Sequence, residues 1–151
     1  MEPKFFITSE KAGFPTKSTP NSAGFDLQAI DTCIIPPGSR KWIETGIGLI
    51  LPKGYYGQIA PRSSLSGRGI DVGAGVIDQD YQGTIKVLLI NNLPSYQQYL
   101  VQRGDKIAQV ILTPILDAEH LVNSPKPTVK TNRGTQGFGS TEKRDTCMNL
   151  Q

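Results

Sequence analysis

The chain has 151 residues, of which 16 are Gly, 11 are Pro, 16 are basic and 13 are acidic. This length suits one domain with its own core, and so many turn residues favour short strands over a helical bundle. The small positive charge and the absence of a long apolar run give no indication of a nucleic-acid or membrane partner. The single His120 disfavours a histidine-based metal cluster or a Ser-His-Asp triad.

The N-terminal residues and the two cysteines indicate the compartment of the protein. The opening residues, MEPKFFITSE, lack the apolar core of a signal peptide, so we expect a cytoplasmic or nuclear location. Cys33 and Cys147 do not form a close pair of the kind that binds zinc. We therefore interpret both as free thiols in a reducing compartment.

The first strand signals lie between residues 25 and 61. Apolar residues at positions 25, 27 and 29 alternate with Asp26 and Gln28, which predicts a half-buried strand with Asp26 opposite the apolar side chains. Residues 33–61 indicate three strands separated by a Pro-Gly and a Pro-Lys-Gly turn. One helical turn is expected after Ser63.

Two later runs complete the predicted sheet. Residues 84–91 (TIKVLLIN) are almost continuously apolar and indicate a central, covered strand, and residues 107–116 indicate another. Strands without long helices predict an all-β fold, as a barrel, sandwich or jelly roll. After Leu121 the composition becomes rich in Pro and Gly, so we expect a β domain over residues 1–122 and a flexible glycine-rich arm over 123–151.

The segment 75–83, GVIDQDYQG, combines two carboxylates and a phenol between two glycines. Asp78 offers a general base and Tyr81 a flat ring that could cover a planar group. The alternative is a β-hairpin with a polar tip, because Asp and Gly are ordinary turn residues. We interpret Asp80 as structural, because a short Asp side chain often bonds the backbone of a turn.

Four more motifs of this character occur along the chain, two before residues 75–83 and two after them. They are AGFDL (23–27), PRSSL (61–65), GDKIAQ (104–109) and RGTQGFGST (133–141). Together the five resemble the motifs of the trimeric deoxyuridine triphosphate nucleotidohydrolases, the dUTPases, over residues 23–141. The resemblance implies a jelly-roll-like homotrimer with shared active sites. It further implies hydrolysis of dUTP to dUMP and pyrophosphate with Mg²⁺, which limits uracil in DNA and supplies dUMP for thymidylate synthesis.

The resemblance implies catalytic roles for Asp78, Arg62 and Ser63. Asp78 would activate the water that attacks the α-phosphate, and Arg62 and Ser63 would contact the phosphate chain. An Arg can fork onto phosphate oxygens, although a surface Arg beside a helix-capping serine is the alternative. Ser64 stands where many members have Gly, and its N–H must stay accessible for the family role.

Two further residues have a phosphate or metal role by resemblance. Gln109 could donate its amide to a phosphate oxygen or bridge backbone groups inside a sheet. Asp26 would reach Mg²⁺ through water, with the ion held mainly by the triphosphate. A buried structural Asp is the competing role.

Base and sugar recognition is expected at the segment that carries Asp78. Backbone groups of Gly75, Val76 and Ile77 could pair with the uracil edge in a slot too narrow for a thymine methyl. Tyr81 would pack on the deoxyribose and leave no room for a 2′-hydroxyl, with core packing as its alternative.

The arm carries the remaining predicted ligands of dUTP. Phe138 would stack over the uracil, and the other residues would meet the phosphates or shape the loop. These residues are Arg133, Gly137, Gly139, Ser140 and Thr141. Residues 142–151 have no assigned function.

Two rival functions remain at this point. The dCTP deaminases share the fold, but they carry a catalytic glutamate where this chain has Leu88, which cannot transfer protons. A dUTP-binding regulatory protein without turnover is the second rival, and retention of Asp78, Arg62 and Phe138 argues against it.

Overall fold

The computed structural model describes residues 1–139, and this part of the chain folds into eleven strands and one helical turn. The strands are β1 (Lys4–Ile7), β2 (Phe25–Gln28), β3 (Cys33–Ile35), β4 (Arg40–Glu44), β5 (Ile47–Ile50), β6 (Tyr55–Ala60), β7 (Ile70–Gly73), β8 (Val76–Ile77), β9 (Lys86–Asn91), β10 (Tyr99–Val101) and β11 (Lys106–Pro114). The helical turn α1 spans Ser63–Ser66. The predicted all-β class is thereby confirmed, and the one helical turn expected after Ser63 begins at Ser63 itself.

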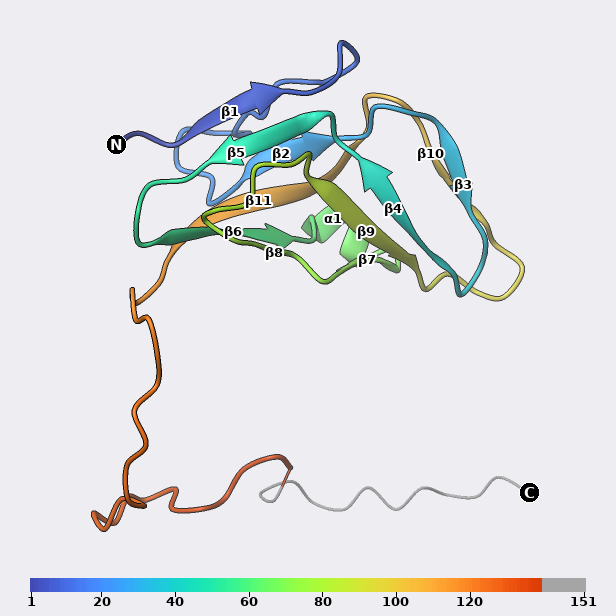
Figure 1. Cartoon of the computed structure of the whole chain (residues 1–151). Coiled ribbons are helices and arrows are strands. Elements are labelled where there is room, and N and C mark those ends of the chain that lie inside the picture. The colour runs from blue at the N-terminus through green and yellow to red at the C-terminus, as the bar shows by residue number, and fades with distance from the viewer. Residues whose placement is uncertain (140–151) are drawn as a thin grey trace, which may run out of the picture. The chain divides into compact units, whose positions relative to one another are not determined.

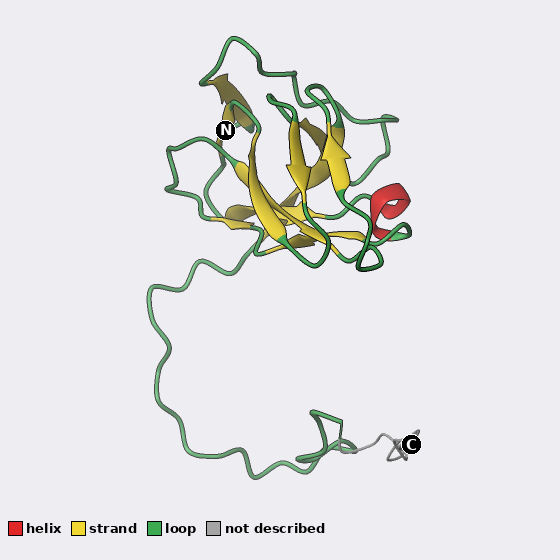
Figure 2. Cartoon of the chain, turned by 90° about the vertical axis from the view of Figure 1, so that its right-hand side faces the viewer, coloured by secondary structure: helices red, strands yellow, loops and turns green. Residues whose placement is uncertain are grey.

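All the strand pairs are antiparallel and fall into four small sheets (Figure 1). The largest has the order β2-β11-β6-β8, and a three-stranded sheet has the order β4-β9-β7. Two-stranded sheets are formed by β1 with β5 and by β3 with β10. Figure 2 shows these strands gathered into one body with α1 at its side.

The structure adds strands that the sequence did not indicate and changes the interpretation of one segment. β1, β7, β8 and β10 have at most four residues each, too few for a clear periodic pattern. β8 pairs with β6, whereas β9 pairs with β4 and β7. The segment 75–83 therefore connects two different sheets, and the β-hairpin that was the alternative interpretation of this segment is not formed.

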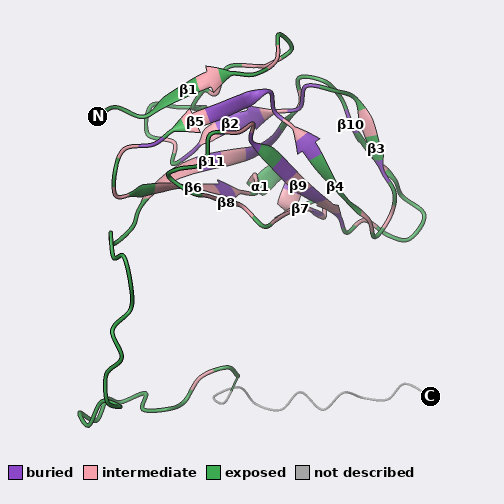
Figure 3. Cartoon of the chain, in the orientation of Figure 1, coloured by how far each residue is buried: buried purple, intermediate pink, exposed green. Residues whose placement is uncertain are grey.

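The core is aliphatic and lies between the sheets (Figure 3). Along β9, Val87 and Leu89 are fully buried, while the alternating residues Leu88 and Ile90 are half-buried. The central position predicted for this run is correct, but one of its faces is only partly covered.

Besides Asp26 of β2, two polar residues are buried in the described chain, and the side chain of each is hydrogen-bonded. Thr45 donates its hydroxyl to the Ile85 carbonyl at 2.7 Å. Asn91 donates from Nδ2 to the carbonyls of Ile35 at 2.9 Å and Gln97 at 3.1 Å, and its Oδ1 accepts from the Leu93 N–H at 2.9 Å. Asn91 thus joins β3, β9 and the loop that leads to β10.

The described chain divides into two units. The compact β unit spans Met1–Asp117, and the second unit starts at Ala118, so the boundary predicted after residue 122 stays a prediction. In the described residues of the second unit the side chains are almost all exposed, including Arg133 and Phe138. Ser140, Thr141, Cys147 and the whole of 142–151 lie outside the described residues. Cys33 carries a free thiol.

Among residues 1–139 no helix has the length and apolar character needed to cross a membrane.

Replacing Asn91 by Leu should lower the free energy of unfolding by about 2–4 kcal/mol, because the buried Ile35 carbonyl and two part-buried backbone groups lose their partner. Urea unfolding followed by circular dichroism measures this change. The matched control is Asn21→Leu, which alters an exposed residue in a loop. Equal stability of the two variants would contradict the structural role of Asn91.

Candidate functional site

Strand register brings three of the predicted motifs together. Gln109, in the middle of β11, lies opposite Asp26 of β2 on one side and opposite Ala60, the last residue of β6, on the other. Pro61 and Arg62 follow Ala60 directly and lead into α1. Residues far apart in the sequence therefore meet at one end of the four-stranded sheet.

A small polar pocket of about 170 Å³ lies at this meeting point. We call it the phosphate pocket, after the ligand that the resemblance of the motifs implies. Its lining includes five predicted site residues and three small neighbours: Asp26, Arg62, Ser63, Ser64, Gln109, Ser18, Ser22 and Gly24. The lining thus combines one buried carboxylate with a guanidinium and several hydroxyl or amide donors.

The Arg62 side chain is held on two sides. Its Nε lies 3.2 Å from Asp26 Oδ1, and its Nη1 donates to the Lys106 carbonyl at 3.2 Å. These contacts use two of the five N–H donors, so the guanidinium retains N–H groups for an incoming anion. The arrangement presents Arg62 in a defined orientation.

Asp26 is buried, with 7% of its surface exposed, and has three polar neighbours. Its Oδ1 faces Arg62, and its Oδ2 accepts from the Ser18 hydroxyl at 3.0 Å and lies 3.5 Å from Lys106 Nζ. Two cations around one carboxylate leave this cluster with a formal charge of +1 by count, from Arg62 and Lys106 against Asp26. Such a cluster suits an anionic ligand.

Gln109 takes its position from a close glycine contact. Its Nε2 donates to the Pro61 carbonyl at 3.0 Å, and its side chain covers the buried Gly24. A Cβ at position 24 would lie 2.6 Å from Gln109 Oε1 and 2.9 Å from Gln109 Cβ. The glycine of AGFDL therefore leaves the space that the Gln109 amide occupies.

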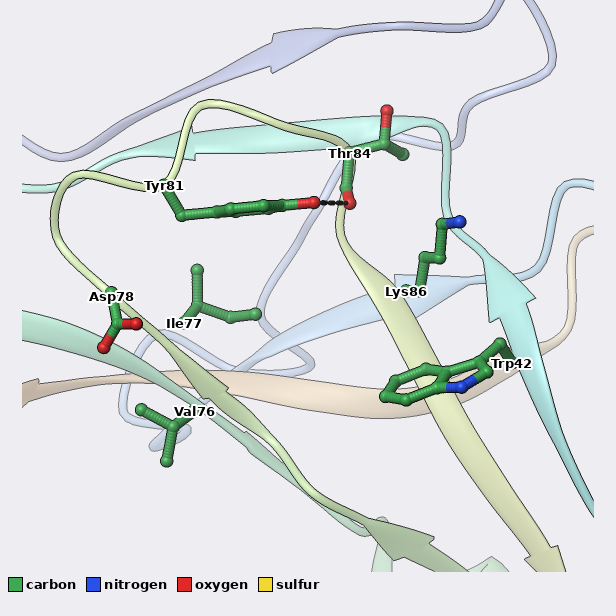
Figure 4. Close-up of a pocket in the computed structure, with 7 residues that line it drawn as sticks. All are labelled: Trp42, Val76, Ile77, Asp78, Tyr81, Thr84 and Lys86. Atoms are coloured by element: carbon green, nitrogen blue, oxygen red, sulfur yellow. Dashed lines mark hydrogen bonds between the residues drawn. The ribbon is translucent and has the colours of Figure 1, made fainter.

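A second, larger pocket of about 420 Å³ lies beside the segment after β8. Its lining contains Val76, Ile77, Asp78 and Tyr81 from the predicted set, together with Trp42, Thr84 and Lys86. In Figure 4 the rings of Tyr81 and Trp42 lie on opposite sides of this space, and the exposed Asp78 carboxylate lies at its edge. We call it the nucleoside pocket, after the ligand that the resemblance of the motifs implies.

Tyr81 is fixed by its hydroxyl and by a neighbouring glycine. The hydroxyl donates to the Thr84 carbonyl at 2.8 Å, and the Tyr81 N–H donates to the Asp78 carbonyl at 3.1 Å. A Cβ on Gly83 would come within 2.6 Å of the phenol carbon that bears the hydroxyl, so the hydroxyl end of the ring lies against this glycine. With 43% of its surface exposed, Tyr81 offers a ring face to a ligand and is not a core residue.

β8 forms the edge of its sheet, with β6 as its single partner. The Gly75 carbonyl accepts from the Ile59 N–H at 2.7 Å and is therefore committed to the sheet. Because backbone groups alternate in direction along an antiparallel strand, those of Val76 face away from β6. Val76 thus presents a backbone donor and acceptor at an open edge.

The turn into β8 has an unusual backbone. Ala74 has φ 53° and Gly75 has φ 113°, both in the left-handed region. Such a conformation at Ala74 costs free energy and persists because neighbouring structure enforces it. This turn sets the direction in which the chain leaves β7 in the three-stranded sheet and enters β8 in the four-stranded sheet.

Sequence reasoning missed several lining residues of both pockets. Trp42, Thr84 and Lys86 belong to none of the predicted motifs. Trp42 and Lys86 reach the nucleoside pocket because β4 pairs with β9, and Thr84 reaches it from the segment between β8 and β9. The Lys86 ammonium also lies 3.1 Å from Glu44 across the β4–β9 pair. Lys106 lies in GDKIAQ, a predicted motif, but its contact with Asp26 depends on the tertiary fold.

The two pockets share no lining residue. The predicted base Asp78 belongs to one pocket, and the predicted phosphate ligands Arg62 and Ser63 belong to the other. In residues 1–139, no group of three or more His, Cys, Asp or Glu side chains is arranged to hold a metal ion.

Comparison with known proteins agrees with the five motifs. The family described as dUTPase matches residues 10–142 of this chain. The deoxyuridine 5′-triphosphate nucleotidohydrolase of vaccinia virus (strain Copenhagen) is 46% identical over 138 residues, which is 91% of each chain. The monkeypox virus protein of the same name is also 46% identical, over 91% of this chain and 89% of its own.

Solved structures of phage dUTPases share the fold. A mutant of the Staphylococcus bacteriophage 80alpha dUTPase, solved with dUpNHpp, superposes with a TM-score of 0.83 at 22% identity, covering 92% of this chain and 97% of its own. A mutant dUTPase from phage phi11 of S. aureus, which coordinates a structural Mg(II) ion, has a TM-score of 0.77 at 23% identity, covering 83% and 98%. The predicted jelly-roll-like fold is confirmed by these likenesses.

The contact between Gly24 and Gln109 yields a stability prediction. Gly24→Ala should lower the free energy of unfolding by about 1–3 kcal/mol, because the new methyl group displaces the Gln109 side chain. Adding Gln109→Ala to Gly24→Ala should recover part of that loss, since the amide leaves the space while the Gln109 Cβ, 2.9 Å from the new methyl position, remains. A double-mutant cycle by urea unfolding measures the coupling, and additive effects would contradict the contact.

Proposed function

We propose that this chain, which belongs to the dUTPase family, hydrolyses dUTP to dUMP and pyrophosphate with Asp78 as the general base. The observation that carries the proposal is the pair of pockets, one polar and cationic and one with an aromatic wall beside a carboxylate. A deoxynucleoside triphosphate has both halves of that chemistry. Removal of dUTP limits uracil in DNA, and the product dUMP is the precursor of thymidylate.

The phosphate pocket would receive the triphosphate. Arg62 supplies charge-assisted hydrogen bonds, and the hydroxyls of Ser63 and Ser64 with the Gln109 amide supply neutral donors. Because Asp26 and the Lys106 carbonyl hold Arg62 in place before the substrate arrives, little reorganisation is needed on binding.

Asp78 would accept the proton of the attacking water. The water oxygen forms a bond to the α-phosphorus, the bond from that phosphorus to the bridging oxygen breaks, and pyrophosphate leaves with the electron pair. The Asp78 carboxylate is exposed and can orient the water through its oxygens.

The nucleoside pocket would select deoxyuridine. The open backbone groups of Val76 can pair with the uracil edge as a neighbouring strand would, and an unmatched base would leave them without partners. The Tyr81 ring, held by Thr84 and Gly83, would pack on the sugar and exclude a 2′-hydroxyl.

Mg²⁺ fits this site only if the substrate supplies ligands. Asp26 is the carboxylate of the phosphate pocket, and its two oxygens have lone pairs beyond those that face Arg62, Lys106 and Ser18. It could therefore bind a water of the ion while the phosphates bind the ion directly, as is usual for Mg²⁺. The ion would neutralise phosphate charge.

We further propose that the active enzyme is a homotrimer whose sites are shared between subunits. Asp78 and Arg62 line different pockets of one chain, so a neighbouring copy could bring the nucleoside pocket of one subunit to the phosphate pocket of another. The arm residues Arg133, Gly137, Phe138 and Gly139 would then cover the bound nucleotide.

Deamination of dCTP is disfavoured by Leu88. This residue lies on β9 opposite Trp42 and Gly73, and its aliphatic side chain has no proton to donate or accept.

Pyrophosphate release should be confined to dUTP when dUTP, dCTP, dTTP and UTP are compared, and it should stop on addition of a chelator. Asp78→Asn should still bind dUTP but lose turnover by at least about 10³-fold, because the amide cannot accept the proton. The matched control is Asp80→Asn, which removes a nearby exposed carboxylate outside both pockets. Tight binding of dUTP by the wild type without turnover would instead indicate a sensor, and release of ammonia from dCTP would indicate a deaminase.

Deleting residues 133–151 should reduce turnover of dUTP by at least about 10²-fold, because the arm would no longer exclude water from the bound nucleotide. The β unit, Met1–Asp117, contains the core and should keep its melting temperature. Steady-state kinetics and differential scanning calorimetry measure both effects. An unchanged turnover number would remove the arm from the mechanism.

A further inference from the structure

Asp71, which no motif assignment uses, joins three segments around the phosphate pocket. The Ser66 hydroxyl donates to Asp71 Oδ1 at 2.7 Å, and Asn92 Nδ2 donates to Asp71 Oδ2 at 2.8 Å. Ser66 is the last residue of α1, Asp71 belongs to β7, and Asn92 directly follows β9. One carboxylate therefore connects α1 to two strands of the three-stranded sheet.

α1 has few other means of keeping its position. It is a single turn, and a helix this short is not stable alone. The N-cap residue before it, Arg62, makes no capping hydrogen bond with its side chain, and Leu65 is the one buried residue of the turn. Burial of Leu65 holds the turn against the core but is non-directional, so the bond from Ser66 to Asp71 sets how the turn is rotated.

The rotation of α1 matters because Ser63 and Ser64 lie on the same turn and line the phosphate pocket. Arg62 differs, since Asp26 and the Lys106 carbonyl hold it independently. Loss of the Asp71 bonds should therefore displace the two serines and leave the guanidinium in place.

The charge on Asp71 strengthens both bonds. The hydrogen bond from Ser66, followed by that from Asn92, lowers the pKa of Asp71 below its usual value of 3.8. The carboxylate is ionised at neutral pH, and hydrogen bonds to an ionised acceptor are stronger than those between neutral groups. The Asn92 N–H also donates to the Gly69 carbonyl at 2.8 Å, and this bond connects the loop between α1 and β7 to the end of β9.

We propose that Asp71 is a positioning residue of the phosphate pocket, which fixes α1 and thereby aligns Ser63 and Ser64 with the phosphate chain of the nucleotide. This role rests on the proposed function of the pocket. Figure 1 shows α1 beside β7, the strand that supplies the carboxylate.

The test reverses the polarity of one hydrogen bond. Asn92→Asp alone places a second carboxylate against Asp71 and removes the donor, so the contact becomes repulsive. Adding Asp71→Asn restores a matched pair, because the new amide can donate to the new carboxylate at position 92 and still accept from Ser66. The control variant is Asp31→Asn, which breaks an exposed ion pair with Lys11 elsewhere on the surface.

Two ligands separate the effect on phosphate from the effect on the nucleoside. One is a non-hydrolysable dUTP analogue with nitrogen between the α- and β-phosphates, and the other is dUMP. Asn92→Asp should weaken binding of the analogue about tenfold, equivalent to one charge-assisted hydrogen bond, and leave binding of dUMP within about twofold. The double variant should return to within about twofold of the wild type. Isothermal titration calorimetry measures each affinity.

Three results would overturn the role of Asp71. They are wild-type affinity for the analogue in Asn92→Asp, equal weakening of both ligands, and failure of the double variant to recover. Because binding is read without turnover, the result stands apart from the proposed function, which fails if the wild type does not hydrolyse dUTP. A wild type that binds neither ligand would overturn both.

Discussion

The antiparallel register of β11 is the constraint on which the phosphate pocket depends. β11 pairs with β2 on one side and β6 on the other, and this pairing sets Gln109 between Asp26 and Ala60. Because side chains alternate between sheet faces, a shift of one residue would turn Gln109 into the core and Val110 out of it. The buried side chains of Ala108 and Val110 prevent that shift, so the aliphatic core also determines the position of the polar site.

Asp26 illustrates how one buried carboxylate organises mobile cations. Its neighbours Arg62 and Lys106 have long side chains that lose rotamer freedom when they are ordered. Pairing with a carboxylate that is already fixed in β2 provides the compensating interaction. Since the cations outnumber the carboxylate in this cluster, attraction for an anion remains after the internal pairing is complete.

The nucleoside pocket depends on a different feature, the passage of the chain from one sheet to another. The left-handed residues Ala74 and Gly75 end the pairing of β7 with β9 and direct β8 onto β6. The chain then returns through Tyr81 to β9 in the three-stranded sheet. An edge strand with open backbone groups and a carboxylate at its end follow from this crossover, which a simple hairpin would not have produced.

The sequence by itself determined the fold class, the short turn after Arg62 and most of the residues that line the two pockets, because turn residues and motif order are local properties. It did not determine that 75–83 links two sheets or that the Gly75 carbonyl is used within the sheet. Nor did it determine that Trp42 and Lys86 line the nucleoside pocket or that Lys106 contacts Asp26. These features depend on which strands pair and in which register. Pairing is decided by burial of the aliphatic core across long sequence separations, and therefore only the tertiary structure could show it.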